Sequence, residues 1–295
     1  MNAIRPFLPL FFYLFAFQIN AQEAERFKLY YAPDKYTNEV RNMLKSQANF
    51  NAYRLMLGWH IDPKNKGVVD KESFIKNIIK FYPNLSSNDI LCIDLENKVY
   101  RDLADYDAGT AGYQKASSAF VWMLKTVKKM RPNVKVGIYG LPFRAYYPNA
   151  KNTNKLDVIL SCADYIFPSL YTMYPDSQIG KLRNEKYLKE NLSIALEYGI
   201  RLKKPVIPFV WSVVHPSNTL SGGQLLSSNE VVQNLKLIEN FSYKNTKVKG
   251  VVWWDPDANY FSKVVKTQMK STNNDPKYLQ SKILQDYLHS YLNAN

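Results

Sequence analysis

Short apolar runs alternate with amphipathic stretches along this chain, and the alternation constrains the fold more than any other feature. Seven apolar runs fit β-strands and lie at residues 28–31, 53–59, 90–95, 135–139, 165–170, 206–211 and 250–254. Near-continuous apolar strands indicate a parallel sheet covered by helices. A length of 295 residues suits one (β/α) barrel with few insertions. We therefore predict an α/β fold, a TIM-like (β/α) barrel in a seven-stranded variant.

The connecting segments have the apolar spacing of amphipathic helices. One carries apolar residues at 74, 75, 78 and 79, and another at 116, 120, 123, 127 and 130, where Pro132 ends it. Ser227 and Glu230 form a capping-box signature before a third helix. Polar residues 62–71 and 216–228 indicate surface loops. We expect the barrel domain to span residues 22–275 and a C-terminal helix at 276–295 to pack on it.

The N-terminus has the pattern of a secretory signal peptide. Arg5 precedes an apolar run from Phe7 to Phe17, and small residues follow up to Ala21. The run is too short for a membrane-spanning helix of about 20 residues, and no later stretch approaches that length. We expect residues 1–21 to be removed, with cleavage near Ala21, and the protein to be secreted or periplasmic.

Two carboxylates end the third apolar run. Asp94 and Glu96 are two residues apart, so on a strand they leave the same face, about 7 Å apart. Acidic residues on a buried face need a partner or a function, and each carboxylate raises the pKa of the other. This pattern favours acid/base chemistry, first of all glycoside hydrolysis. The alternative is structural: a helix cap or an ion pair.

Aromatic residues follow the other strand ends, where a barrel collects its functional groups. They include Tyr139, Tyr146, Tyr171, Trp211 and Trp254. Aromatic rings offer flat apolar faces for sugar C–H groups, and tyrosine hydroxyls add hydrogen bonds. The pattern suits a carbohydrate groove, although each ring considered alone could equally belong to the core. Neighbours on a strand face opposite ways, so only one of Trp253 and Trp254 can point inward.

Five segments in order resemble the hyaluronidases of glycoside hydrolase family 56. The matching residues are 93–96 (IDLE), 137–142 (GIYGLP), 167–171 (FPSLY), 204–210 (KPVIPFV) and 250–254 (GVVWW). The resemblance implies a seven-stranded barrel that hydrolyses a β-linked N-acetylhexosaminide in a glycosaminoglycan. It also implies Glu96 as general acid/base and Asp94 as its partner, with Tyr139, Tyr171 and Trp254 against the substrate. The nucleophile would be the substrate's own acetamido oxygen.

The chain departs from that family in several positions. The family continues Asp-Cys-Tyr after its Tyr-Gly-Phe-Pro turn, whereas this chain has Phe143, Arg144 and Ala145. A polar cluster is therefore missing or is supplied by Tyr146. Trp211 stands where the family has a polar residue, and the family's disulfides are absent. These departures concern the identity of the substrate more than the type of reaction.

Charge and cysteine usage limit the partners. The formal charge is +14, and loss of Arg5 with the signal leaves +13. An anionic polysaccharide substrate is consistent with this charge, as is a merely soluble basic surface. We expect no nucleic-acid partner, because the predicted signal peptide implies export and the sequence has no nucleic-acid-binding motif. Cys92 and Cys162 are free or form one bridge. The three histidines lack metal-ligand spacing, so we expect no metal, no cofactor and a monomer.

Three functions remain open on the sequence. The first is a secreted, endo-acting glycosidase of the hyaluronidase type. The second is a barrel that binds carbohydrate in the same aromatic groove without turnover. The third is a glycosidase that uses two enzymic carboxylates, drawn from Asp94, Glu96 and Asp255, on a neutral polysaccharide.

Overall fold

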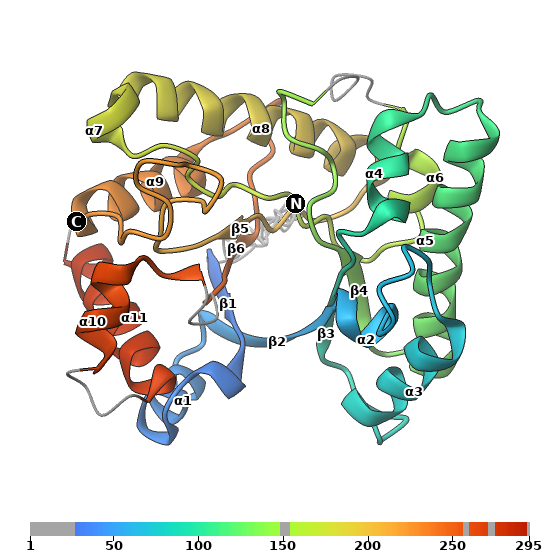
Figure 1. The fold of residues 1–295 in the computed structure, drawn as a ribbon, viewed down its shortest axis with the longest axis horizontal. Coiled ribbons are helices and arrows are strands. Elements are labelled where there is room, and N and C mark those ends of the chain that lie inside the picture. Colours follow the sequence, from blue (N-terminus) through green and yellow to red (C-terminus); the bar gives the residue numbers. More distant parts are fainter. Residues whose placement is uncertain (1–26, 148–153, 256–259, 271–274, 294–295) are drawn as a thin grey trace, which may run out of the picture.

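Six parallel strands form one curled sheet in the computed structural model, which describes residues 27–147, 154–255, 260–270 and 275–293 (Figure 1). The strand order is β4-β3-β2-β1-β6-β5. The strands are β1 (Lys28–Tyr31), β2 (Phe50–Leu57), β3 (Ile90–Asp94), β4 (Lys135–Ile138), β5 (Phe209–Val210) and β6 (Gly250–Trp253). All five pairings are parallel, as the near-continuous apolar runs predicted. The signal peptide predicted for residues 1–21 lies outside the described residues.

Among the described residues, the fifth predicted run, residues 165–170, forms no strand and is present as single bridges between the two edges of this sheet. Residues 164–170 accompany β4 through a parallel bridge between Tyr139 and Phe167, and β5 through one between Ser169 and Phe209. Pro168 has no N–H to donate in the middle of this segment, and Pro208 directly precedes β5. Missing donors interrupt a regular ladder, which explains the bridges and the two-residue length of β5. The seven-stranded prediction is therefore confirmed in part.

Helices surround the sheet. They are α1 (Asn38–Lys45), α2 (Gly58–Ile61), α3 (Lys71–Phe81), α4 (Lys98–Asp105), α5 (Ala111–Met130), α6 (Asp157–Leu160), α7 (Asp176–Ile179), α8 (Lys181–Leu202), α9 (Ser228–Asn240), α10 (Lys263–Lys270) and α11 (Pro276–Leu292), with the 3-10 turn η1 (Pro33–Lys35). Figure 1 shows α3, α4 and α5 beside β3 and β4, and α9, α10 and α11 at the opposite end. Among the described residues, no helix is both long and apolar enough to cross a membrane.

The helix predictions hold in most positions. In α5 the residues at 116, 120, 123 and 127 are buried, and the helix ends at Met130. Ser227 caps α9 by accepting a hydrogen bond from the Glu230 N–H, but the Glu230 carboxylate accepts from Asp176 N instead of closing the capping box. The prediction that residues 74, 75, 78 and 79 share one buried helix face is wrong in part. In α3, Phe74 and Ile78 are fully buried, whereas the side chains at 75 and 79 are exposed, because this outer helix buries only a narrow i, i+4 stripe.

The C-terminal helix α11 packs along the side of the fold, against α9 and η1. The Ser281 hydroxyl accepts from the Thr37 backbone N–H at 3.0 Å. The Tyr287 hydroxyl donates to the Leu226 carbonyl at 2.6 Å. Both cysteines are free, Cys92 in the core and Cys162 half-buried, so the bridge considered between them is absent.

Candidate active site

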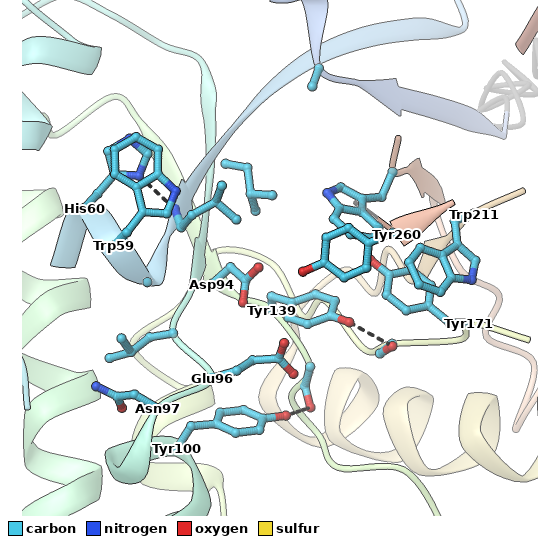
Figure 2. Close-up of a pocket in the computed structure, with 18 of the residues that line it drawn as sticks. Trp59, His60, Asp94, Glu96, Asn97, Tyr100, Tyr139, Tyr171, Trp211 and Tyr260 are labelled. Carbon is cyan, nitrogen blue, oxygen red and sulfur yellow. Dashed lines mark hydrogen bonds between the residues drawn. The ribbon is translucent and has the colours of Figure 1, made fainter. Parts of the chain in front are cut away.

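A large cleft opens beside the carboxyl end of β3. Its volume is about 1880 Å³, whereas sites for one small molecule span about 300–1,000 Å³. Figure 2 shows Asp94 and Glu96 between the Trp59 and His60 rings on one side and the Tyr171 and Trp211 rings on the other. The cleft therefore suits an extended ligand lying across the carboxylate pair.

Seven residues predicted from the sequence as the acidic pair and its aromatic surroundings line this one cleft. These residues are Asp94, Glu96, Tyr139, Tyr146, Tyr171, Trp211 and Trp254. They come from chain segments up to 160 residues apart, and the parallel sheet brings them together because its strand ends share one edge. The predicted opposite orientation of Trp253 and Trp254 is confirmed. Trp253 is fully buried, whereas Trp254 is partly exposed in the cleft.

The acidic pair lies where β3 ends. Asp94 is the last residue of β3 and pairs with Leu57 of β2, and Glu96 follows in the loop before α4. Burial raises the pKa of Asp94 well above its ordinary value, and the Glu96 charge raises it further. Burial also raises the pKa of Glu96, against the opposing charge of Arg144. The pair consequently keeps a proton at higher pH than two isolated carboxyls, as a general acid requires.

The Tyr139 turn joins this pair to the aromatic wall. The Tyr139 hydroxyl donates to Ser169 Oγ at 3.1 Å, and its ring lies 5.9 Å from the Tyr171 ring. Gly140 follows with φ of 76°, and a Cβ there would lie 2.5 Å from the Tyr100 hydroxyl, which itself donates to the Gly140 carbonyl. Only glycine fits both the left-handed backbone and that contact.

Three stacked rings form the wall. Tyr171 and Trp211 lie 4.2 Å apart between centroids, and Trp254 stacks on Trp211 at 5.0 Å. Tyr260 meets the Trp254 ring edge-on at 5.5 Å. Trp211 is only 4% exposed and its buried indole N–H has no partner among the described residues, so it supports the wall more than it contacts a ligand. The partly exposed Trp254 is the better stacking surface for a sugar.

Arg144 is a cleft residue that sequence reasoning noted only as a departure from the family motif. Its guanidinium donates to Ser169 Oγ at 2.6 Å, to the Tyr146 hydroxyl at 2.9 Å and to Met173 Sδ at 3.1 Å. It also lies over the Tyr171 ring at 6.0 Å. Tyr146 itself is 56% exposed at the rim and stacks on Tyr147. The structure thus has an arginine and a tyrosine after the Tyr139 turn.

Trp59 and His60 line the opposite side of the cleft and were also missed. The strand predicted over residues 53–59 ends at Leu57, and residues 58–61 turn into α2. The Trp59 ring is 64% exposed and stacks on His60 at 3.5 Å. His60 is held by a hydrogen bond from Leu57 N to its Nδ1. A tryptophan at the carboxyl end of a predicted strand was the available sequence signal.

Asp255 lies away from the cleft. It is 2% exposed and accepts hydrogen bonds from the Tyr36 hydroxyl and, at 3.1 Å, from the Trp253 indole N–H. Burial raises its pKa well above the ordinary value. Its partners and its burial give it a structural role, which removes it as the second enzymic carboxylate. Among the described residues, no three His, Cys, Asp or Glu side chains gather as metal ligands would.

Two solved structures of one enzyme align with nearly the whole described chain. A crystal structure of bee venom hyaluronidase matches with a TM-score of 0.59 and 15% identity over 87% of this chain and 100% of that one. The same enzyme in complex with a hyaluronic acid tetramer matches with a TM-score of 0.62 and 15% identity over 85% and 97%. The chain has the hyaluronidase fold.

The resemblance inferred from the five sequence segments is therefore confirmed as a resemblance of fold. A scan of protein-family models and a search of curated proteins gave no match. The hyaluronidase fold accounts for the curled parallel sheet. At 15% identity it does not extend to substrate or to catalysis, which depend on the side chains of the cleft.

Proposed function

We propose that this protein is an endo-acting glycoside hydrolase that cleaves β-linked N-acetylhexosaminides in a glycosaminoglycan, either hyaluronan or chondroitin. The observation that carries the proposal is the Asp94 and Glu96 pair, with raised pKa values, inside a cleft walled by aromatic rings. The hyaluronic acid tetramer bound by the enzyme of the same fold supports the choice of polymer. The N-terminal pattern up to Ala21 supports export to where such polymers occur.

In the proposed reaction Glu96 gives its proton to the glycosidic oxygen, and the bond from that oxygen to the anomeric carbon breaks. The substrate's acetamido oxygen attacks the anomeric carbon and forms a cyclic oxazolinium ion. Asp94 orients and polarises the acetamido group from beside Glu96. The Glu96 carboxylate then takes a proton from the water that opens the ring, so the anomeric configuration is retained. Tyr139 and Tyr171 line the same side of the cleft and help to position the sugar.

The placement of the acids favours this substrate-assisted route over two enzymic carboxylates. Two such carboxylates act from opposite sides of the scissile bond. Asp94 and Glu96 leave the end of a single strand, and Figure 2 shows both carboxylates pointing the same way, toward the Tyr139 side. Asp255, the other acid considered, is buried outside the cleft. A nucleophile supplied by the substrate removes the need for an acid on the far side.

The test is Glu96→Gln, assayed with hyaluronan, chondroitin and N-acetylglucosamine oligomers by mass spectrometry of the products. We expect hydrolysis to fall by about 10²- to 10⁴-fold while the polysaccharide still binds, because the amide keeps the shape and loses the proton. Glu190→Gln, on the exposed face of α8, is the matched control and should cleave normally. Normal turnover by folded Glu96→Gln would refute the assignment, and binding without cleavage by the wild type would favour the non-catalytic alternative.

A further inference from the structure

Arg144 carries a positive charge in the cleft, and no carboxylate among the described residues forms an ion pair with it. Its three hydrogen-bond acceptors, Ser169, Tyr146 and Met173, are all uncharged. Two of its five N–H groups, on Nε and Nη2, have no acceptor among the described residues. No carboxylate oxygen of the residues that the structure describes lies within 4.0 Å of the Arg144 guanidinium.

Two other arginines that are at least partly buried have partners within the protein. Arg201 pairs with Asp157. Arg131 donates to the carbonyls of Tyr82 and Met130. A cation in a cleft without an anionic partner loses part of its hydration, and that free-energy cost is offset only when a ligand brings a negative charge. Arg144 differs from Arg201 in having no carboxylate within 4.0 Å among the described residues, and from Arg131 in lining the cleft, where a ligand can reach it.

Its position beside Glu96 indicates which part of a ligand it meets. Arg144, Glu96 and His215 line the same cleft. The Arg144 charge opposes the rise that burial causes in the pKa of Glu96. Burial lowers the pKa of His215 to about 4, and the Arg144 charge adds to that effect. In the proposed reaction Glu96 protonates the oxygen that departs with the leaving sugar. In hyaluronan and chondroitin, the sugar that leaves an N-acetylhexosaminide is a hexuronate, which carries a carboxylate. A cation close to Glu96 thus faces the side of the cleft where that carboxylate lies.

We propose that Arg144 binds the carboxylate of the hexuronate unit next to the scissile bond and so selects an acidic polymer over a neutral one. This inference rests on the proposed function and specifies its substrate class. A guanidinium offers two parallel N–H groups that match a carboxylate, which gives orientation as well as affinity. Ser169 and Tyr146 hold the guanidinium in place before the substrate arrives, so little side-chain freedom is lost on binding.

The experiment compares two ligands that differ only in charge. The first is a hyaluronan oligosaccharide, and the second is the same oligosaccharide after reduction of its carboxylates to alcohols. Binding is measured by calorimetry on Glu96→Gln protein, which does not consume the ligand, and kcat and KM are measured on protein with Glu96 intact. Each measurement is repeated with Arg144→Gln, with Arg144→Lys and with Arg183→Gln, which removes the same charge from the exposed surface of α8.

We expect Arg144→Gln to weaken binding of the acidic oligosaccharide by about 10- to 100-fold, the cost of a lost charged hydrogen-bonding pair. Binding of the reduced oligosaccharide should stay unchanged. Arg144→Lys keeps the charge and should recover part of the preference, and it is the fallback if the glutamine variant does not fold. Arg183→Gln should keep the full preference. A structural role for Arg144 would instead weaken both ligands equally and would overturn the proposal.

The outcomes also separate this inference from the proposed function. If the acidic oligosaccharide is preferred through Arg144 but is never cleaved, Arg144 is a uronate-binding residue and the hydrolase assignment fails. If hyaluronan is cleaved and Arg144→Gln keeps the full preference for it, the hydrolase assignment stands and the inference is wrong. A wild-type protein that binds the acidic and reduced ligands equally well overturns the inference directly.

Discussion

Asp94→Asn should move the alkaline limb of the pH–rate profile to lower pH. Asp94 and Glu96 titrate as a pair, and burial raises the pKa of both. While both acids are present, the second ionisation creates two neighbouring negative charges, so the pair keeps its last proton to higher pH. Asparagine removes one of these charges but keeps the shape. The pKa of Glu96 then depends on burial and on the Arg144 charge alone, so Glu96 loses its proton at a lower pH than in the wild type. The proposed general acid is therefore lost at that lower pH.

The size of the shift follows from Coulomb's law. Glu96 lies two residues along the chain from Asp94, just past the end of β3, so we take about 7 Å as the order of magnitude of the separation. Two unit charges at that distance interact by about 0.6 kcal/mol in water and by about 2.4 kcal/mol at an effective dielectric constant of about 20. At 1.36 kcal/mol per pKa unit, these energies correspond to about 0.4 and 1.7 pH units. Glu96 remains accessible to solvent in the cleft, so we expect a shift in the lower half of that range.

Arg144→Gln provides a matched perturbation of opposite sign. The Arg144 cation lowers the pKa of Glu96, so its removal should move the alkaline limb to higher pH. The assay is kcat/KM against pH, which reports the free enzyme. A carboxyl-reduced oligosaccharide is the substrate, so that loss of a substrate-binding charge does not distort the comparison. Shifts in the same direction for both variants, or no shift in either, would refute the electrostatic account of the pair.

Three further variants test other parts of the site. Tyr171→Phe keeps the stack with Trp211, so we expect an unchanged melting temperature and a lower kcat; a normal rate would make the hydroxyl irrelevant to the reaction. Trp59→Ala removes an exposed ring, so we expect the free energy of unfolding to change by less than about 0.5 kcal/mol. KM should rise more for long oligosaccharides than for short ones. An equal rise at all lengths would exclude a contact between Trp59 and a sugar far from the scissile bond. Asp255→Asn leaves one of two buried donors without its acceptor, so we expect the free energy of unfolding, measured with denaturant, to fall by about 1–3 kcal/mol. The rate per folded molecule should stay normal. Loss of activity in a stable protein would return Asp255 to the catalytic candidates.

The position of the site followed from the sequence because two simple rules acted together. Apolar runs located the strands, and the carboxyl ends of parallel strands share one edge. Asp94, Tyr139 and Trp254 could therefore be placed in one site although they lie far apart along the chain. The cleft confirms that placement. The rules could not predict how far each side chain is buried. Trp211 and Trp254 looked equivalent in the sequence, yet Trp211 is buried and Trp254 is partly exposed.

The errors arose where tertiary contacts override local pattern. Pro168 and Pro208 remove ladder donors, so the fifth run bridges two sheet edges without forming a strand. The apolar residues at 75 and 79 fit a helical stripe, but no described part of the chain buries that face of α3, and both side chains are exposed. The role of Arg144 depends on Ser169 and Met173, which follow it by more than twenty residues. No spacing rule connects such residues before the fold is known.

Arg144 also resolves a conflict within the proposed function. A general acid needs a pKa raised by burial and by a neighbouring carboxylate, and the same carboxylate makes the cleft negative. A polyanionic substrate would be repelled by that charge. When Asp94 and Glu96 share one proton, they carry one negative charge, which the Arg144 cation balances. The cleft can then accept a hexuronate beside the acid, while the proton needed for cleavage stays on the pair.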